Sequence, residues 1–103
     1  MFEQTTAETL NSVAEFAELA GYMDDPEFTK ALEMIVKIMA SPDIPPQKAR
    51  SLIVWCEAMS AKFGMLASYY AHVKRDDRAK KNMYFTGRDS MQRLGDALKY
   101  IFK

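Results

Sequence analysis

The residues best suited to chemistry lie in one stretch, SYYAHVKRDDRAKKNMYF, at residues 68–85. It places five basic residues and the only histidine between two aromatic pairs. Clustered cations can bind phosphates, and exposed aromatic rings can stack on bases. The candidate nucleic-acid-binding residues are Lys74, Arg75, Arg78, Lys80, Lys81, Tyr69 and Phe85. The alternative is a solvated turn between helices, partly neutralised by Asp76 and Asp77.

The positions of these cations separate them into two groups. Lys74 and Arg75 close an expected helix, where cations stabilise the negative end of the helix dipole by about 0.3–1 kcal/mol each. Arg78, Lys80 and Lys81 fall in the first turn of the next expected helix, where the dipole opposes positive charge. Helix electrostatics therefore does not explain why these three cations stand at the start of a helix. Binding of an anionic ligand would explain it.

The zero net charge of the chain hides an asymmetry between its halves. Residues 1–50 hold nine acids and four bases, a net charge of −5, whereas residues 51–103 hold five acids and ten bases, a net charge of +5. Either the two halves face each other, within a subunit or between subunits, or the basic half meets an anionic partner.

Residues typical of enzymes are scarce. The chain has no glycine-rich phosphate loop, and one histidine with one cysteine cannot form a four-ligand zinc site without help from carboxylates or another chain. The paired carboxylates Asp24-Asp25 and Asp76-Asp77 are better explained as helix caps, since sequence neighbours do not face each other on a helix. Cys56 is expected to be a small buried hydrophobe. The sequence therefore predicts a protein that is not an enzyme and uses neither cofactor nor metal.

The elements that position the basic stretch are predicted to be helices of a single all-α domain. Glycine and proline are scarce, at four each in 103 residues, and apolar residues recur at helical spacing. The expected helices span about residues 6–20, 26–40, 46–74 and 78–102. The first begins with a capping box at Thr5–Glu8, in which Thr5 is the cap, and ends near Gly21. The Asp25-Pro26 pair starts the second.

The last two expected helices share a heptad pattern, with apolar residues at steps of three and four. The first set is Ala49, Leu52, Cys56, Met59, Phe63, Leu66, Tyr70 and Val73, and the second is Tyr84, Gly87, Met91, Leu94, Leu98 and Ile101. Two patterns of similar length on either side of a short polar turn predict a long antiparallel hairpin that turns near residues 75–77. Tyr70 should then lie near Tyr84, and Leu66 near Gly87. The two N-terminal helices should cover one side of this small bundle.

One point in the hairpin stays open. Thr86-Gly87-Arg88-Asp89 also has the form of a helix cap, so the last helix either continues or breaks near residues 86–88.

Four further residues are candidates for protein contacts: Trp55, Met23, Met65 and Met83. Flexible methionines suit adaptable interfaces, and tryptophan is enriched in binding hot spots. Trp55 either packs on the first two helices or anchors a contact between subunits. With 49% apolar residues in so short a chain, we expect a homo-oligomer.

The expected location is the cytoplasm. No basic segment followed by an apolar one opens the sequence, so no signal peptide is predicted, and a lone cysteine fits a reducing compartment. The apolar stretch 52–73 contains Glu57 and Lys62, which would each cost about 2.5–3.5 kcal/mol inside a bilayer, so we expect a buried helix and no membrane span.

Three segments, LASYY, KKNMYF and DALKYI, also carry a resemblance. Over residues 46–103 the chain is similar to small helical phage accessory proteins, and in particular resembles the UvsY-type recombination mediators, which have a helix ending in two tyrosines, a basic turn and a further helix. The resemblance implies association with single-stranded nucleic acid and assembly into a ring-like oligomer.

The sequence thus favours a small helical module, phage-like in character, that binds single-stranded nucleic acid through its basic-aromatic turn. A protein-protein adaptor or inhibitor that docks on a larger host or viral complex is the alternative. A structural subunit of an assembly is the third.

Overall fold

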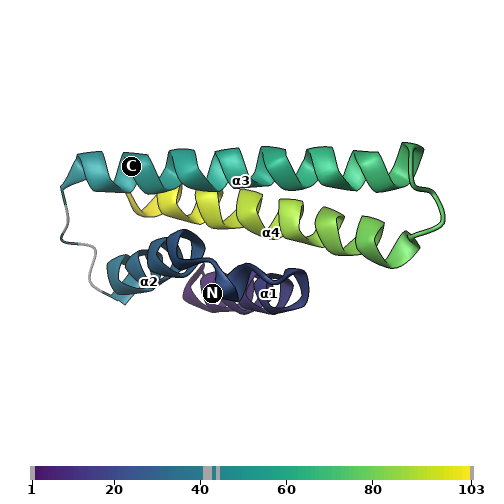
Figure 1. Ribbon diagram of the computed structural model, residues 1–103. Helices are drawn as coiled ribbons and strands as arrows, with labels where there is room; N and C mark the ends of the chain where they lie inside the picture. The colour runs from purple at the N-terminus through teal and green to yellow at the C-terminus, as the bar shows by residue number, and fades with distance from the viewer. Residues whose placement is uncertain (1, 41–42, 44, 103) are drawn as a thin grey trace.

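The chain forms a bundle of α-helices in the computed structural model, which describes residues 2–40, 43 and 45–102, with residues 2–6 as backbone only (Figure 1). The helices in these ranges are α1 (Phe2–Ala20), α2 (Pro26–Ala40), α3 (Pro46–His72) and α4 (Arg78–Ile101), with a short 3₁₀ helix, η1 (Tyr22–Asp24), between the first two. The predicted all-α class is confirmed.

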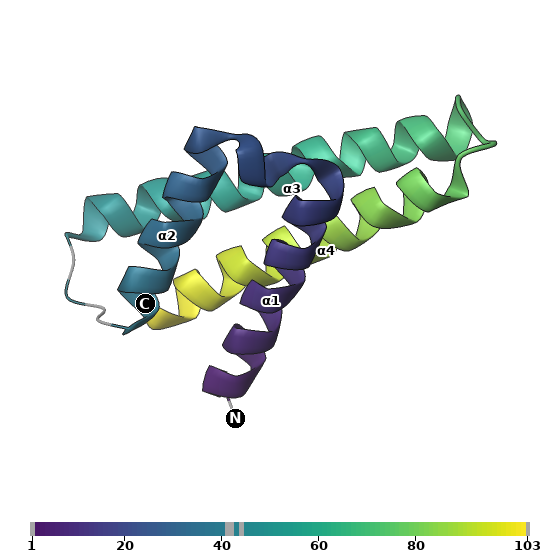
Figure 2. The same cartoon turned by 60° about the horizontal axis from the view of Figure 1, so that its bottom comes forward.

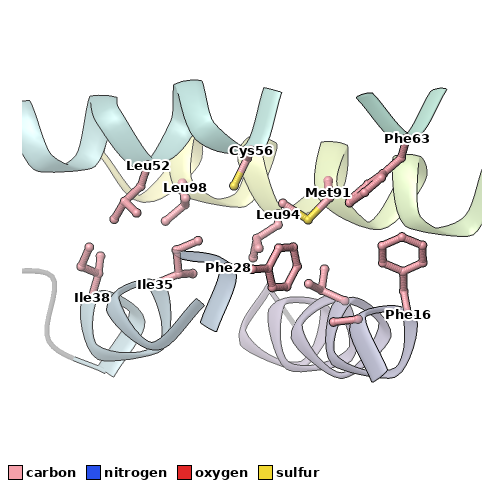
Figure 3. Packing of buried hydrophobic residues seen from close by; sticks show 12 residues of the cluster. Phe16, Phe28, Ile35, Ile38, Leu52, Cys56, Phe63, Met91, Leu94 and Leu98 are labelled. Atoms are coloured by element: carbon pink, nitrogen blue, oxygen red, sulfur yellow. The ribbon is translucent and has the colours of Figure 1, made fainter. Parts of the chain in front are cut away.

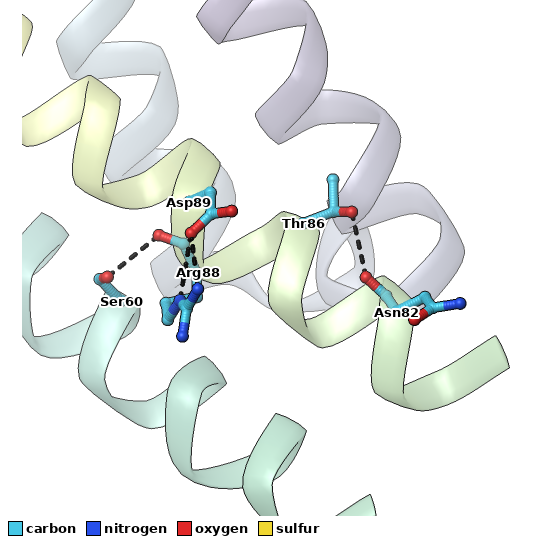
Figure 4. Close-up of polar contacts among 5 residues, drawn as sticks. All are labelled: Ser60, Asn82, Thr86, Arg88 and Asp89. Carbon is cyan, nitrogen blue, oxygen red and sulfur yellow. Dashed lines mark hydrogen bonds and ion pairs between the residues drawn. The ribbon is translucent and has the colours of Figure 1, made fainter. Parts of the chain in front are cut away.

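Helices α3 and α4 run antiparallel and side by side, as both views show (Figures 1 and 2). The rings of Tyr70 and Tyr84 stack with their centroids 5.8 Å apart, as the heptad patterns predicted. Helix α4 is continuous through Gly87, so the break near residues 86–88 does not occur. The Thr86 hydroxyl instead donates to the carbonyl of Asn82 within the helix (Figure 4). The predicted helical hairpin is therefore present.

The connection between α1 and α2 follows its local sequence. Gly21 adopts the left-handed conformation, with φ of 83°, that was predicted to end the first helix. The Asp25 carboxylate accepts a hydrogen bond of 3.0 Å from the backbone N–H of Glu27, and Pro26 opens α2. The start of α1 was predicted wrongly, because the helix already begins at Phe2 and the segment Thr5–Glu8 lies inside it.

The core lies where α1 and α2 cross the hairpin (Figure 3). Helix α4 is the central element, because it packs on α3 on one side and on α1 on another, and its buried positions include Met91, Leu94 and Leu98. Phe16 of α1 meets Phe63 of α3 edge to face at 4.6 Å between ring centroids. The two N-terminal helices thus cover one side of the hairpin, as predicted.

One predicted detail of the heptad patterns is wrong, and one close contact was not foreseen. Gly87 makes room for Phe16 of α1, whose ring a Cβ at position 87 would overlap, whereas the prediction had considered only Leu66 as its neighbour. Val73, predicted as the last inward residue of its pattern, is 69% exposed because α3 ends at His72 and the chain turns there.

Candidate nucleic-acid interface

The turn of the hairpin projects beyond α1 and α2 in both views (Figures 1 and 2). We call residues 69–81 the hairpin tip. At its start, the backbone N–H groups of Val73 and Lys74 both donate to the carbonyl of Tyr69, at 2.8 and 3.1 Å. At its end, the Asp77 carboxylate caps α4 by accepting the backbone N–H of Lys80 at 3.1 Å. The tip is therefore a hydrogen-bonded turn between the end of α3 and the start of α4, and it holds most of its charged side chains in solvent.

The cations of the tip face solvent. Lys74, Arg75, Arg78 and Lys80 are exposed, and Lys81 is half-buried. The Arg75 Nε group donates to the carbonyl of His72 at 3.3 Å, which ties this side chain to the end of α3. The structure thus brings all five predicted cations to one end of the molecule.

Lys80 has local partners that the sequence did not reveal. Its Nζ lies 3.9 Å from the Asp77 carboxylate and 5.5 Å from the centroid of the Tyr70 ring. Asp77 therefore neutralises part of the charge of Lys80, as the alternative of a solvated turn had it, although a pair so exposed contributes little. Among the described residues, Lys74, Arg78 and Lys81 form no ion pair within 4 Å, and these three are the cations most available to a ligand.

The two candidate aromatic residues differ in accessibility. Tyr69 is 42% exposed, and its ring meets that of Tyr70 edge to face at 5.1 Å. Phe85 is half-buried one helical turn after Lys81, and the guanidinium of Arg88 lies 4.8 Å from its ring centroid. Tyr69 is therefore the better placed of the two for stacking.

Arg88 is a cation that the sequence reasoning missed. It pairs with the Asp89 carboxylate at 3.0 Å, and its carbonyl accepts a hydrogen bond of 3.0 Å from the Ser60 hydroxyl (Figure 4). Its three-residue spacing from Phe85 was the available signal, because residues so spaced are neighbours on a helix. Its pairing with Asp89 leaves it a secondary candidate.

The four candidates for protein contacts lie on separate surfaces. Trp55 packs against Phe28 of α2, with ring centroids 5.3 Å apart, which is the first of its two predicted roles. Met23 borders a hollow of about 330 Å³ on α2, Met83 lies against the core, and Met65 is 75% exposed on α3. They do not form a single contact surface.

Cys56 is buried between α3 and α4, and a Cβ at Gly95 would lie 3.3 Å from its own. Burial raises its pKa to about 12, so the reactive thiolate is scarce at neutral pH.

Among the described residues, no group of three or more acidic, histidine or cysteine side chains could hold a metal ion. The helices in the same ranges are also too short or too polar to cross a membrane.

Comparisons of the chain with protein-family models, with curated proteins and with solved structures give no match.

Proposed function

We propose that this protein is a non-enzymatic cytoplasmic module that binds single-stranded nucleic acid through its hairpin tip. The observation that carries the proposal is the placement of the five tip cations at one projecting end, beside the exposed ring of Tyr69. A phosphate backbone can run past such an end without meeting the acidic helix α1.

The charge balance of the tip supports an anionic ligand. Of its two acids, Asp77 is occupied by the helix cap and by Lys80, so it reduces the positive charge only locally. Lys74, Arg75, Arg78 and Lys81 remain for phosphates, each as an exposed or half-buried cation. The bases of a single strand are free to stack on the accessible ring of Tyr69, whereas the bases of a duplex are already stacked on one another.

The resemblance to UvsY-type mediators points to the same ligand class, and it extends the proposal to assembly of several copies. In such an assembly, several tips would contact one strand.

The direct test is a titration of a fluorescently labelled single-stranded oligonucleotide with the wild-type protein. The test variant is Arg78→Gln, Lys80→Gln and Lys81→Gln together. The matched control removes three exposed cations elsewhere, Lys30→Gln, Lys37→Gln and Lys48→Gln, and so changes the net charge equally. We expect the tip variant to bind more weakly than the control. Absence of binding by the wild type at low salt, or equal loss in both variants, would contradict the proposal.

A protein-protein adaptor is the second candidate function. It is favoured by the apolar hollow on α2, which Met23, Leu32 and Val36 line at the edge of the core. Pull-downs from nuclease-treated and untreated lysate separate the two functions: partners that persist after nuclease support the adaptor, and partners lost with nuclease support nucleic-acid binding.

A further inference from the structure

The solvent side of α3 carries a second heptad pattern, opposite the one that faces the core. Positions 47, 51, 54, 58, 61, 65, 68 and 72 recur at alternating steps of four and three, and all are exposed. The middle four are apolar: Val54, Ala58, Ala61 and Met65. Val54 is 63% exposed and Met65 75% exposed. The outer positions of this row are polar, so the unusual feature is a run of four exposed apolar residues on a helix whose other face is already buried.

We infer that this face is a self-association surface, through which two copies of the chain form a parallel, in-register coiled coil along α3. The two alanines at its centre let the helices approach closely, and Val54 and Met65 supply the larger apolar contacts on either side. All eight positions are exposed, and one side of α3 is not covered by α1, α2 or α4 (Figure 1), so a second copy can reach this surface.

Charge complementarity selects a second copy and a parallel orientation. In parallel coiled coils, the residue at position g pairs with the residue five places later, at position e, of the other helix. Glu57 and Lys62 occupy these positions, so Glu57 of each chain faces Lys62 of the partner subunit. In an antiparallel pair, position g would instead face position g of the other helix and position e would face position e. Both attractive contacts between Glu57 and Lys62 would then be lost.

Glu57 and Lys62 are available for this role. Glu57 receives Lys99 at 2.8 Å, and its side chain stays 55% exposed. The Nζ of Lys62 lies 5.4 Å from the Tyr22 ring centroid, and this lysine is also exposed. Both contacts are at the surface, where they contribute little and leave the side chains able to reach a second copy.

The parallel arrangement has a geometric consequence. Because the helices run in the same direction, both hairpin tips lie at the same end of the dimer. The inference does not depend on the proposed ligand of the tip, and its tests use the protein alone.

Sedimentation equilibrium of the full chain measures the association. We expect a concentration-dependent dimer in the wild type and at least a roughly tenfold weaker dimer for Met65→Glu, since it buries two uncompensated charges in the contact. The matched control is Val36→Glu, an equally apolar-to-acidic change at a residue 50% exposed on α2. Both positions face solvent, so both variants should fold, and thermal melting checks that they do. A wild-type monomer at the highest soluble concentration, or dissociation by Val36→Glu alone, would overturn the inference.

Charge reversal tests the pairing. Glu57→Lys and Lys62→Glu should each weaken the dimer several-fold, and the double variant should restore it, because attraction returns only when both are exchanged. If the double variant instead lost as much dimer affinity as the two single variants together, the pairing would be ruled out.

Cross-linking tests the orientation. In the parallel dimer, chains carrying Ser68→Cys should form disulfides with one another, since equivalent positions of this kind lie within bonding distance. Chains carrying Ser51→Cys should do the same. A mixture that cross-links position 51 to position 68, in preference to like with like, would show an antiparallel pair and refute the inference.

Discussion

The ring of Phe16 occupies the space that a side chain at Gly87 would need. This contact joins α1 to the central helix of the bundle, and Phe16 is itself enclosed by the rings of Phe63, Tyr22 and Tyr84. The ring therefore has little freedom to move aside.

Gly87→Ala should destabilise the fold in spite of the higher helix propensity of alanine. The propensity gain is about 1 kcal/mol, whereas overpacking a core costs about 1–3 kcal/mol, so we expect a net loss in the free energy of unfolding. Gly64→Ala is the control, since a Cβ there would meet only the flexible Arg88 side chain, at 3.2 Å. It should be neutral or stabilising in urea unfolding. Equal effects at the two positions would contradict the packing described for Gly87.

Removal of the Asp77 cap should separate stability from binding. Asp77→Ala takes away the hydrogen bond to the Lys80 backbone, and loss of an N-cap costs about 0.5–2 kcal/mol. Asp76→Ala removes the same charge from an exposed residue that does not cap α4. Both variants should bind an oligonucleotide more tightly at low salt, but only the first should lower the melting temperature. Unaltered stability in Asp77→Ala would mean that the cap contributes nothing.

Stability should fall in alkaline solution through Cys56. Its pKa rises from 9.0 to about 12 on folding, so the unfolded chain releases the thiol proton first. The stabilising contribution is complete below pH 9 and is lost as the pH rises toward 12, at about 1.4 kcal/mol per pH unit. Tyr84 and Lys99, whose pKa values are also raised, act in the same direction.

Urea unfolding between pH 7 and pH 11 measures this loss. Cys56→Ala should lower stability at pH 7, through lost packing, but should show a shallower decline above pH 9. Identical slopes in the two proteins would assign the alkaline loss to other groups.

The accessible ring at the tip should contribute to binding by stacking. Tyr69→Ala should cost about 1–3 kcal/mol of oligonucleotide affinity if one base stacks there. Phe85→Ala should cost less, because Arg88 covers its ring. Fluorescence anisotropy measures both, and circular dichroism checks that each variant stays helical. A larger effect at Phe85 would place the strand further along α4.

The hairpin was predictable because heptad spacing identifies the inward face of a long helix without knowledge of its partner. The stack of Tyr70 on Tyr84 and the burial of Cys56 both followed from counting outward from one turn.

The partner of Gly87 was not predictable in the same way. Spacing shows that position 87 faces inward, but Phe16 reaches it from a helix that crosses the hairpin, and no local pattern encodes that crossing. The start of α1 was missed because the capping signal at Thr5 was outweighed by helix-compatible residues before it.

The candidate site was predictable in composition but not in detail. The sequence identified the basic turn, yet the pairing of Lys80 with Asp77 and the position of Arg88 over Phe85 depend on side-chain geometry at the helix start and on the face of α4.

The central claim, that the tip cations contact a phosphate backbone, is tested most directly by the salt dependence of oligonucleotide binding. With four or five contacts, the wild type should show a log-log slope of about −3, and the tip variant with Arg78→Gln, Lys80→Gln and Lys81→Gln should fall to about −1. The control with Lys30→Gln, Lys37→Gln and Lys48→Gln should keep the wild-type slope. A slope near zero in the wild type, or the same slope in the tip variant as in the wild type, would contradict the account.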